Sequence, residues 1–396
     1  MKKEKVLIVG GGFAGVKTAL ELADDNRFSV TLLTENHDFR YYPTLFHAAT
    51  GGKRANASIP LKTFFDNTSV RVHTGRAATL DRKAKTITTR SGDIVEYDTL
   101  VLALGVVTNY FGIPGLEDFS YGIKSIEQIE RFKKHLHQQL IDERKPDLNY
   151  VIVGGGPTGI ELAGALPQYL RQIMKAHGIH QRNVHIDLVE SSPRLLGRGP
   201  RDTSRMIERR LRRLGIRLHL GKVVQGQTAD GLTVSGKPIQ SHTVIWTAGV
   251  TNNPFFSENH FVLMGRGKVA TDIYLQAEEN IFVLGDNANT PYSGFAQTAV
   301  HDGAFMAENL KRRADGKQFE SYTAKEPWSV IPVGARWASA TRGGFRTYGL
   351  LGALLRVAAE FVGFHDYQPW QAAGKQWLTG FGTEETCKIC TAAIAE

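Results

Sequence analysis

The chain has 396 residues, of which 42% are hydrophobic and 22% are charged, so it is long enough for two or three domains with ordinary cores and is not intrinsically disordered. Its net charge of +9 predicts a surface that attracts anions such as nucleotide phosphates or acidic lipids. Zinc-knuckle spacing, a helix-turn-helix pattern and interleaved arginine and aromatic residues are all missing, so nucleic acid is not an expected partner. The only cysteines are Cys387 and Cys390, which excludes a disulfide framework and a reactive cysteine earlier in the chain.

An apolar run at residues 6–9 leads directly into three glycines. This run is too short for the apolar core of a signal peptide, so we interpret it as a buried first strand. We therefore expect a protein on the cytoplasmic side of the membrane, with neither a signal peptide nor a transmembrane helix.

The strongest feature of the sequence is an internal repeat. A β-branched strand, a glycine turn and a helix occur at residues 6–23 and again at residues 151–175, which predicts two dinucleotide-binding βαβ units. The first turn contains Gly10, Gly12 and Gly15, with Phe13 and Ala14 between them. These glycines permit a tight turn and close approach of a pyrophosphate to the helix N-terminus. Glu35, just after the second strand, is placed to accept hydrogen bonds from a ribose; the alternative is a plain glycine-rich turn with a solvated Glu35.

The second unit repeats the pattern with Gly154, Gly156 and Gly159, and with Pro157 and Thr158 between them. Glu190 ends the next strand, where a carboxylate hydrogen-bonds a ribose 2′-hydroxyl and repels a 2′-phosphate, so NADH is favoured over NADPH. Arg194 weakens this inference because an arginine could pair with that phosphate; otherwise it is a surface cation. Gly164 is expected to let its helix lie close to its own sheet.

Two further segments resemble those of two-dinucleotide flavoproteins. Residues 280–286 resemble their second FAD fingerprint, in which the aspartate, here Asp286, holds the flavin ribityl chain. Residues 100–105 resemble the strand that ends in a glycine, here Gly105, and joins the FAD module to the NAD module. Each alone could be a buried strand that ends in a turn. All four motifs in this order predict non-covalent FAD near the N-terminus and NADH in the middle of the chain.

The chain resembles the type II NADH:quinone oxidoreductases, through residues 42–51, 154–164, 246–250 and 296–301. The resemblance covers about residues 5–310 and is weaker over the last seventy. It implies that Pro43 and Thr44 lie near the flavin ring, with Ala296 and Gln297 also at FAD. It also implies that Ala248 and Gly249 lie near nicotinamide and flavin, and that Gln297 and position 301 lie at the quinone pocket.

Three polar residues are catalytic candidates: Glu161, Gln297 and His301. The resemblance places Glu161 near the junction of nicotinamide, flavin and quinone, whereas the helix dipole alone would also favour a carboxylate there. His301 stands where the family usually carries a second glutamine. It lies one helical turn beyond Gln297, so both can face one pocket; the alternative is a solvated helix histidine.

An amphipathic helix is predicted at residues 349–363, with seven apolar side chains on one face and Arg356 and Glu360 on the other. It is too short to span a bilayer. With Trp370 and Trp377 following, residues 349–377 fit attachment to an anionic membrane surface, or else core or homodimer packing. We expect this region to be separable from the nucleotide-binding part.

Cys387 and Cys390 have the spacing of half a zinc site, but no second pair or nearby histidine accompanies them. We therefore expect no metal within one chain and interpret the pair as part of an exposed, reduced tail. An intermolecular disulfide or a metal shared between chains remains the alternative. Sulfide:quinone and disulfide reductases are disfavoured because their essential cysteines have no counterpart before residue 387.

The predicted fold class is α/β, with two Rossmann-like dinucleotide-binding domains, the second inserted in the first. The FAD domain comprises residues 1–115 and 255–325, the NADH domain residues 116–254, and the C-terminal region residues 326–396. The predicted function is transfer of a hydride from NADH to FAD and of two electrons on to a membrane quinone, without proton pumping. The alternatives are a soluble NADH-dependent reductase of a ferredoxin or similar carrier, and a slow-turnover redox sensor.

Overall fold

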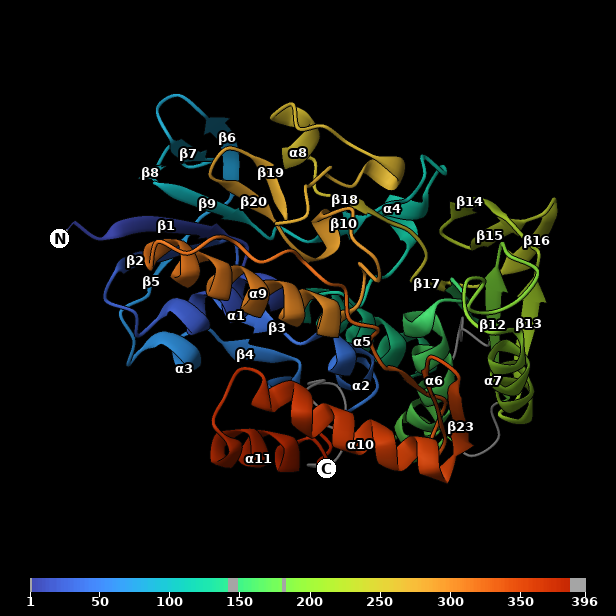
Figure 1. The fold of residues 1–396 in the computed structure, drawn as a ribbon. Coiled ribbons are helices and arrows are strands. Elements are labelled where there is room, and N and C mark those ends of the chain that lie inside the picture. The colour runs from blue at the N-terminus through green and yellow to red at the C-terminus, as the bar shows by residue number, and fades with distance from the viewer. Residues whose placement is uncertain (1, 142–148, 180–182, 385–396) are drawn as a thin grey trace.

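The computed structural model describes residues 2–141, 149–179 and 183–384. The cysteine pair at 387 and 390 lies outside these described residues. Figure 1 shows two sheets side by side, each covered by helices, and a C-terminal unit that runs beneath both. The predicted pair of Rossmann-like sheets is confirmed.

The first sheet has the strand order β19-β20-β9-β1-β2-β5, and only the β19–β20 pair is antiparallel. Its strands are β1 (Glu4–Val9), β2 (Phe28–Thr34), β5 (Arg71–Thr74), β9 (Thr99–Leu102), β19 (Gln276–Glu278) and β20 (Ile281–Val283). Alternate side chains of β1 enter different cores, with Ile8 on one face and Leu7 on the other. Burial of both faces explains why the strand is a continuous apolar run instead of an alternating one.

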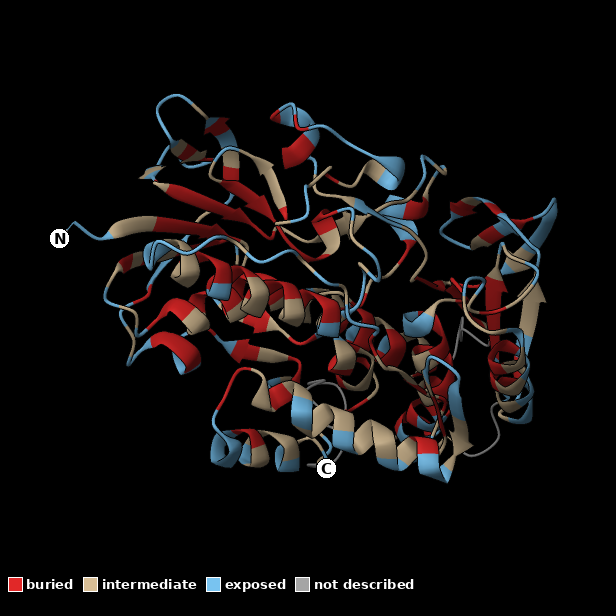
Figure 2. Ribbon diagram, in the orientation of Figure 1, coloured by how far each residue is buried: buried red, intermediate tan, exposed pale blue. Residues whose placement is uncertain are grey.

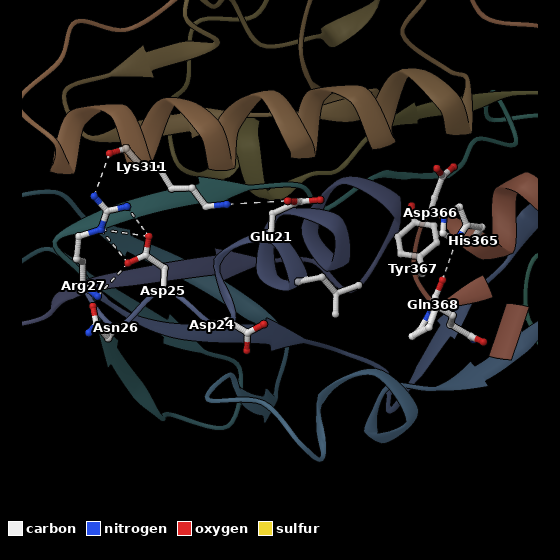
Figure 3. A pocket seen from close by; sticks show the side chains of 12 residues that line it. Glu21, Asp24, Asp25, Asn26, Arg27, Lys311, His365, Asp366, Tyr367 and Gln368 are labelled. Atoms are coloured by element: carbon white, nitrogen blue, oxygen red, sulfur yellow. Dashed lines mark hydrogen bonds and ion pairs between the residues drawn. The ribbon is translucent and has the colours of Figure 1, made fainter. Parts of the chain in front are cut away.

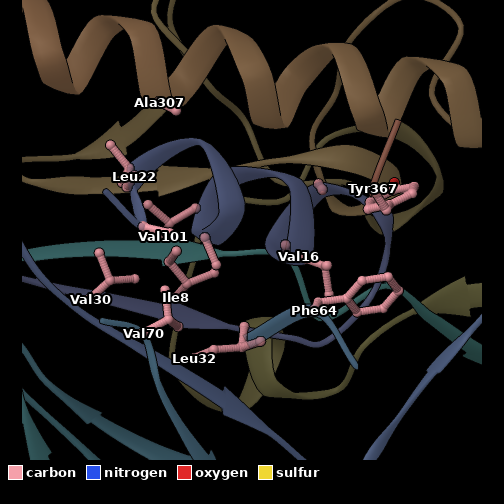
Figure 4. Packing of buried hydrophobic residues seen from close by; sticks show 14 of the residues in the cluster. Ile8, Val16, Leu22, Val30, Leu32, Phe64, Val70, Val101, Ala307 and Tyr367 are labelled. Carbon is pink, nitrogen blue, oxygen red and sulfur yellow. The ribbon is translucent and has the colours of Figure 1, made fainter. Parts of the chain in front are cut away.

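Helices cover one face of this sheet and a small β-meander covers the other. The helices are α1 (Phe13–Leu22), α3 (Lys62–Phe65) and α9 (Ala296–Ala314), and the meander is β6 (Ala77–Asp81), β7 (Thr86–Thr89) and β8 (Ile94–Glu96). Figure 4 shows Ile8 and Val101 of the sheet below Ala307 of α9, and Val16 of α1 belongs to the same cluster. Gly303 of α9 allows the close approach of the two helices, because a Cβ there would lie 2.6 Å from the carbonyl oxygen of Ala14.

The second sheet has the order β13-β12-β11-β17 and is entirely parallel. Its strands are β11 (Asn149–Val153), β12 (His185–Glu190), β13 (Ile216–Leu220) and β17 (Thr243–Trp246). Its helices are α5 (Ile126–Ile141), α6 (Pro157–Ala176) and α7 (Arg201–Arg213), and its meander is β14 (Val224–Thr228), β15 (Gly231–Val234) and β16 (Lys237–Gln240). The 3.6-residue spacing of apolar residues in α6 buries one stripe of that helix against the sheet.

Two segments of the chain connect the two sheets. They pair as an antiparallel ribbon of β10 (Val106–Thr108) and β18 (Val250–Asn252). The remaining short elements are β3 (Asp38–Arg40), η1 (Tyr42–Thr44), α2 (Leu45–Ala49), η2 (Arg54–Asn56), β4 (Ser58–Pro60), α4 (Leu116–Phe119), α8 (Phe255–Glu258), η3 (Gly265–Gly267) and η4 (Gly285–Asn287).

The C-terminal unit belongs to both cores. It consists of β21 (Ser329–Pro332), β22 (Ala338–Arg342), β23 (Phe345–Gly349), α10 (Leu350–His365) and α11 (Trp370–Thr379). Ile331 and Val333 are buried with the second sheet, whereas Phe364, Tyr367 and Ala373 are buried with the first. Tyr367 lies beside Phe64 and Val16 in Figure 4. The C-terminal unit thus shares buried contacts with both sheets, whereas the sequence predicts a region separable from the nucleotide-binding part.

Gly164 permits a close approach, but to a different part of the chain from the one that the sequence predicts. A Cβ at this position of α6 would lie 2.6 Å from the backbone nitrogen of Gly334 and 2.9 Å from Val333. The glycine thus permits a close approach to the loop after β21, not to its own sheet. Helical spacing predicts which residues share a face but does not identify the element that packs there.

Candidate functional site

The first glycine turn forms a phosphate cradle between β1 and α1. Gly10 has a φ of 118° and would place a Cβ 2.1 Å from the carbonyl oxygen of Ala103, and a Cβ at Gly15 would lie 1.9 Å from the Gly10 carbonyl oxygen. Gly12 differs, because no atom lies within 4 Å of the Cβ that it lacks. No side chain caps the helix at this end. The free N–H groups and open space at Gly12 therefore fit a pyrophosphate.

Two carboxylates flank this cradle. Glu35 follows β2 and is exposed, with Arg76 Nη1 3.5 Å from its Oε1, so it is accessible to a ribose. Asp286 lies in η4, where burial raises the pKa of its carboxyl while the Lys268 ammonium opposes that rise. Phe13 and Ala14 begin α1, and the Phe13 carbonyl accepts a hydrogen bond from Tyr367 Oη at 3.0 Å. The C-terminal unit therefore supports the first turn directly.

The second glycine turn repeats this geometry between β11 and α6. A Cβ at Gly154 would lie 2.7 Å from the Ala248 nitrogen, and one at Gly159 would lie 1.9 Å from the Gly154 carbonyl oxygen. Gly156 again has open space in front of it, and Pro157 begins the helix without a side-chain cap. Pro157 and Thr158 are both exposed. The two cradles are thus built alike.

Glu190 lies at the end of β12, beside the second turn. Its Oε2 accepts the Gly155 N–H at 2.6 Å and its Oε1 accepts the Ser192 N–H at 2.6 Å. The carboxylate is therefore held at the edge of the cradle, where a ribose would lie.

The neighbouring Arg194 is occupied within its own loop. Its Nη1 donates to the carbonyl oxygens of Leu196 and Gly199 and to Ser204 Oγ, at 2.8–3.1 Å. A guanidinium engaged in this way folds the loop and is not directed at a ribose. Arg194 therefore stabilises the loop that follows β12.

A buried amide fixes the junction between the two domains. Asn287 Oδ1 accepts the Gly105 N–H at 2.8 Å, and its Nδ2 donates to the Gly105 carbonyl at 2.7 Å and to Asn252 Oδ1 at 2.6 Å. Gly105 precedes β10 and Asn252 ends β18, so the side chain of Asn287 connects the two segments that join the domains. Sequence reasoning identified Gly105 and Asp286 but missed Asn287; its position directly after Asp286 was the available signal.

The flavin-facing turn predicted from the resemblance lies in η1. Thr44 is buried, and its hydroxyl donates to the carbonyl oxygens of Tyr41 and Asn56 at 3.1 and 2.8 Å. That hydroxyl therefore stabilises the turn. The Pro43 carbonyl accepts a hydrogen bond from Arg356 Nη2 at 2.6 Å, so α10 helps to hold this turn in place.

Helix α10 directs its charged side chains into the protein. Arg356 and Glu360 lie 3.9 Å apart and are mostly buried, on the same face as the buried Gly352 and Phe364. Their charges act on Glu161, whose pKa is raised to about 8 by burial, with Arg356 lowering it and Glu360 raising it further. The same two charges act on His47, whose pKa is lowered chiefly by burial. A polar cluster therefore lies between α10, α6 and the flavin-facing turn.

The apolar side of α10 faces outward. Four side chains on this side are strongly exposed: Leu350 (63%), Leu351 (55%), Leu354 (60%) and Val362 (52%). Trp370 and Leu378 of α11 and Phe381 beyond it are exposed as well. Figure 2 shows this helix pair along one edge of the molecule, in pale blue and tan. We call these seven residues the apolar face; they reverse the usual orientation of an amphipathic helix.

Gln297 and His301 lie on one side of α9, as predicted, and both contact the extended chain that follows it. Gln297 Oε1 accepts the Trp328 N–H at 3.0 Å, and its Nε2 lies 3.5 Å from the Trp328 carbonyl. His301 Nε2 donates to the Thr323 carbonyl at 2.9 Å. Ala296 begins the helix. The two side chains are thus hydrogen-bonded to residues 323–328, and Gln297 is also exposed to solvent.

A recess of about 890 Å³ lies away from both cradles (Figure 3). It is at the C-terminal end of α1, whereas the phosphate cradle is at the other end of that helix. Its charges are largely paired, with Arg27 bound to Asp25 and Lys311 4.0 Å from Glu21. We assign it no role in the chemistry. Within the described residues, no group of three or more potential ligands is arranged to hold a metal ion.

Comparison with known proteins gives consistent results. Residues 4–303 match the pyridine nucleotide-disulphide oxidoreductase family. Type II NADH:quinone oxidoreductases of Staphylococcus saprophyticus and Staphylococcus aureus are each 26% identical over 357 residues, which cover 84% of this chain and 88% of the relative.

Two solved structures share the fold. The NDH2 of Plasmodium falciparum in complex with NADH has a TM-score of 0.82 at 16% identity and covers 96% of this chain and 97% of its own. The sulfide:quinone oxidoreductase of Aquifex aeolicus has a TM-score of 0.77 at 19% identity and covers 98% of each chain. At such identities the likeness shows the fold alone.

The raised pKa of Glu161 predicts a pH-dependent effect on stability. Because its pKa rises from 4.5 to about 8 on folding, the folded protein binds this proton more tightly than the unfolded chain. The stabilisation is therefore complete below about pH 4.5 and is lost as pH rises through 8. Glu161→Gln should match the wild type near pH 5 and be more stable near pH 9, where every tenfold difference in proton affinity between the folded and unfolded states corresponds to about 1.4 kcal/mol.

Thermal unfolding at several pH values between 5 and 9 measures this difference. Glu258→Gln, at an exposed position of α8, is the matched control and should leave the profile unchanged. Equal effects of Glu161→Gln at pH 5 and pH 9 would contradict the prediction.

Proposed function

The chain belongs to the pyridine nucleotide-disulphide oxidoreductase family, and we propose that it is a type II NADH:quinone oxidoreductase that transfers electrons from NADH through FAD to a membrane quinone. Its relatives of that name match along most of the chain. We include in the proposal that the transfer is not coupled to proton pumping and occurs at the cytoplasmic face of the membrane.

The observation that carries this proposal is the orientation of α10. Its apolar side faces outward, while Arg356 and Glu360 lie inside, beside Glu161 and the turn at Pro43. One helix thus joins a surface suited to lipid with a polar site between two nucleotide cradles. This arrangement favours a lipid-soluble acceptor, because a soluble ferredoxin would require no such surface.

The second cradle would hold NADH. Gly154, Gly156 and Gly159 provide the turn, Pro157 and Thr158 the helix start, and Glu190 the ribose contact. Ala248 and Gly249 follow β17 and adjoin this cradle, as the 2.7 Å approach to Gly154 indicates. They are placed to contact the nicotinamide half, and Glu161 lies in the second turn of α6, the helix that begins at this cradle.

The first cradle would hold FAD without a covalent bond. Gly10, Gly12, Phe13, Ala14 and Gly15 provide the pyrophosphate site, Glu35 the ribose contact, and Asp286 the ribityl contact. Pro43, Thr44, Gly105, Ala296 and Gln297 surround the expected position of the ring. Bound FAD supplies the redox chemistry, accepting a hydride and passing on electrons. The protein orients the partners and determines the local polarity.

The quinone site is proposed beside Gln297, His301 and Glu161. A glutamine amide can donate to a quinone carbonyl, and a carboxyl whose pKa lies near 8 can hold or release a proton near neutral pH. Glu161 is therefore the better-supported proton carrier, while Gln297 and His301 act as binding residues. Their present hydrogen bonds to residues 323–328 imply that this segment forms one wall of the site.

The structure separates the proposed enzyme from one of the two alternatives. The soluble-reductase alternative shares both cradles but leaves the apolar face unexplained. A slow redox sensor would share every contact described above, so only turnover separates it from the enzyme.

An acceptor screen on the purified flavoprotein tests the proposed function. NADH oxidation should be fast with ubiquinone or menaquinone analogues and slow with ferredoxin or oxygen. Gln297→Ala should slow reoxidation of the reduced protein by quinone, while its reduction by NADH in a stopped-flow experiment stays within about twofold of wild type. Release of FMN on denaturation, or preference for ferredoxin, would refute the proposal; slow turnover with every acceptor would favour the sensor.

The fixed position of Glu190 predicts cofactor selectivity. Glu190→Ala removes both the ribose contact and the repulsion of a 2′-phosphate, so the ratio of kcat/KM for NADH to that for NADPH should fall by about tenfold or more. Glu208→Ala provides a control, because that side chain lies on α7 and its Oε1 is 3.3 Å from the Leu195 nitrogen of the same loop. An unchanged ratio of the two kcat/KM values for Glu190→Ala would show that another residue recognises the ribose.

The apolar face predicts membrane attachment that point substitutions can remove. The pair Leu351→Glu and Leu354→Glu should abolish cosedimentation with vesicles of anionic phospholipid while leaving FAD content and NADH oxidation by a water-soluble quinone near wild type. Val262→Glu is the control, since Val262 is 71% exposed and follows α8, on the opposite side of the molecule in Figure 1. Unchanged sedimentation, together with a smaller particle by light scattering, would instead identify a homodimer interface.

No helix among the described residues is long and apolar enough to cross a bilayer. Attachment is therefore proposed to occur at the surface, through the apolar face and the exposed cations Arg342 and Lys375 beside it. Binding to neutral vesicles as strong as to anionic ones would remove the electrostatic part of this proposal.

A further inference from the structure

The nicotinamide end of the second site can be located from the topology. A dinucleotide lies across the carboxyl ends of a parallel sheet, with its adenosine ribose at the acid that ends the second strand. Here that acid is Glu190 at the end of β12, and the glycine turn follows β11. The strand on the other side of β11 is β17. The nicotinamide half therefore extends towards the residues after β17, which include Gly249.

One aromatic side chain projects at this end. Phe111 lies in the loop between β10 and α4 and is 61% exposed. Its ring lies so close to Gly249 that a Cβ there would be 2.5 Å from Phe111 Cε2. The ring also meets Trp246, the last residue of β17, edge-on with centroids 6.3 Å apart. Phe111 therefore stands at the end of the sheet where the nicotinamide half is expected.

The backbone at Phe111 is held in an unfavourable conformation. Its φ is 54°, in the left-handed region that bulky residues rarely adopt. Asn109 holds this conformation through two hydrogen bonds. Its Oδ1 accepts the Phe111 N–H at 2.7 Å. Its carbonyl oxygen accepts the Trp246 Nε1–H at 3.0 Å, which ties the loop to β17. A large apolar ring that is held in a strained backbone yet left exposed gains little from the protein core. A ligand that covers the ring would account for both features.

We propose that Phe111 forms the apolar wall against which the nicotinamide half of NADH binds. The inference rests on the proposed function and assigns one more residue to its second site. The absence of a side chain at Gly249 lets the Phe111 ring lie against its backbone, and a flat nicotinamide offers an aromatic surface of matching size to the exposed part of the ring. Contact between two aromatic rings contributes enough to change affinity by roughly two- to tenfold. Phe111 thus contributes to binding of the reactive half without contacting the adenosine half.

Binding of two ligands that differ only at this end tests the proposal. Dissociation constants of NAD⁺ and of ADP-ribose, which lacks nicotinamide, are measured by the change in flavin absorbance or by competition with NADH. Phe111→Gly removes the ring and relieves the positive φ, so the protein should stay folded. It should weaken NAD⁺ binding by about five- to tenfold and leave ADP-ribose binding within about twofold. Phe111→Tyr keeps the ring and should restore NAD⁺ affinity.

Phe119→Gly is the matched control, because Phe119 is a nearby exposed phenylalanine, 42% exposed, in α4; it should alter neither constant. If Phe111→Gly changes neither ligand, or weakens both equally, the ring does not contact nicotinamide and the proposal is overturned. Failure of the wild-type protein to be reduced by NADH would instead refute the proposed function. Unchanged FAD content of each variant shows that the first site is intact.

Discussion

The side-chain amide of Asn287 joins the two segments of chain that cross between the nucleotide domains. It is fully buried, and its oxygen and nitrogen are both hydrogen-bonded, to Gly105 and to Asn252. Removal of one partner of such a group leaves the other unsatisfied in a dry environment, which costs more than the bond contributes when it is made. Because hydride transfer requires reacting atoms about 3–3.5 Å apart, the fixed relation between the two domains is part of the proposed chemistry. Asn287 follows Asp286 directly, so the residue that orients the domains adjoins one that would hold the flavin.

The C-terminal unit is a second element, besides Asn287, that connects the two nucleotide domains. Its first half packs on α6, where Gly164 and Gly334 allow two backbones to touch. Its second half reaches the first domain, where the ring of Phe364 stacks on that of Tyr41 at 4.6 Å. Arg356, between these two ends, holds the Pro43 carbonyl. A movement of the second domain relative to the first would therefore have to break the contacts of the C-terminal unit with one domain or the other.

The sequence predicts the parts of this site whose constraints are local. Gly10 and Gly15 are required by atoms a few residues away or by the adjoining strand, so strand, turn and helix are recognisable as one motif. The contacts of Asn287 and Gly164 join residues far apart in the chain, and nothing in their neighbourhood identifies the partner. The case of α10 is intermediate. Periodicity assigns its side chains to two faces correctly, but only packing reveals that the charged face is the inner one, because the usual expectation places apolar residues inside.

This reversed orientation places two charged side chains next to Glu161, a partly buried carboxyl. A lone carboxyl in such a position would be held neutral by desolvation over the whole physiological range. Arg356 favours its charged form and Glu360 its neutral form, and both charges are carried on adjacent turns of the same helix. Small displacements of α10 would change two opposing interactions at once, so the proton affinity of Glu161 depends on where that helix rests. The outer face of the helix is the apolar face, whereas its inner contacts with Pro43 and Tyr41 hold it in position. The proton affinity of Glu161 therefore depends on the same contacts that hold this helix against the first domain.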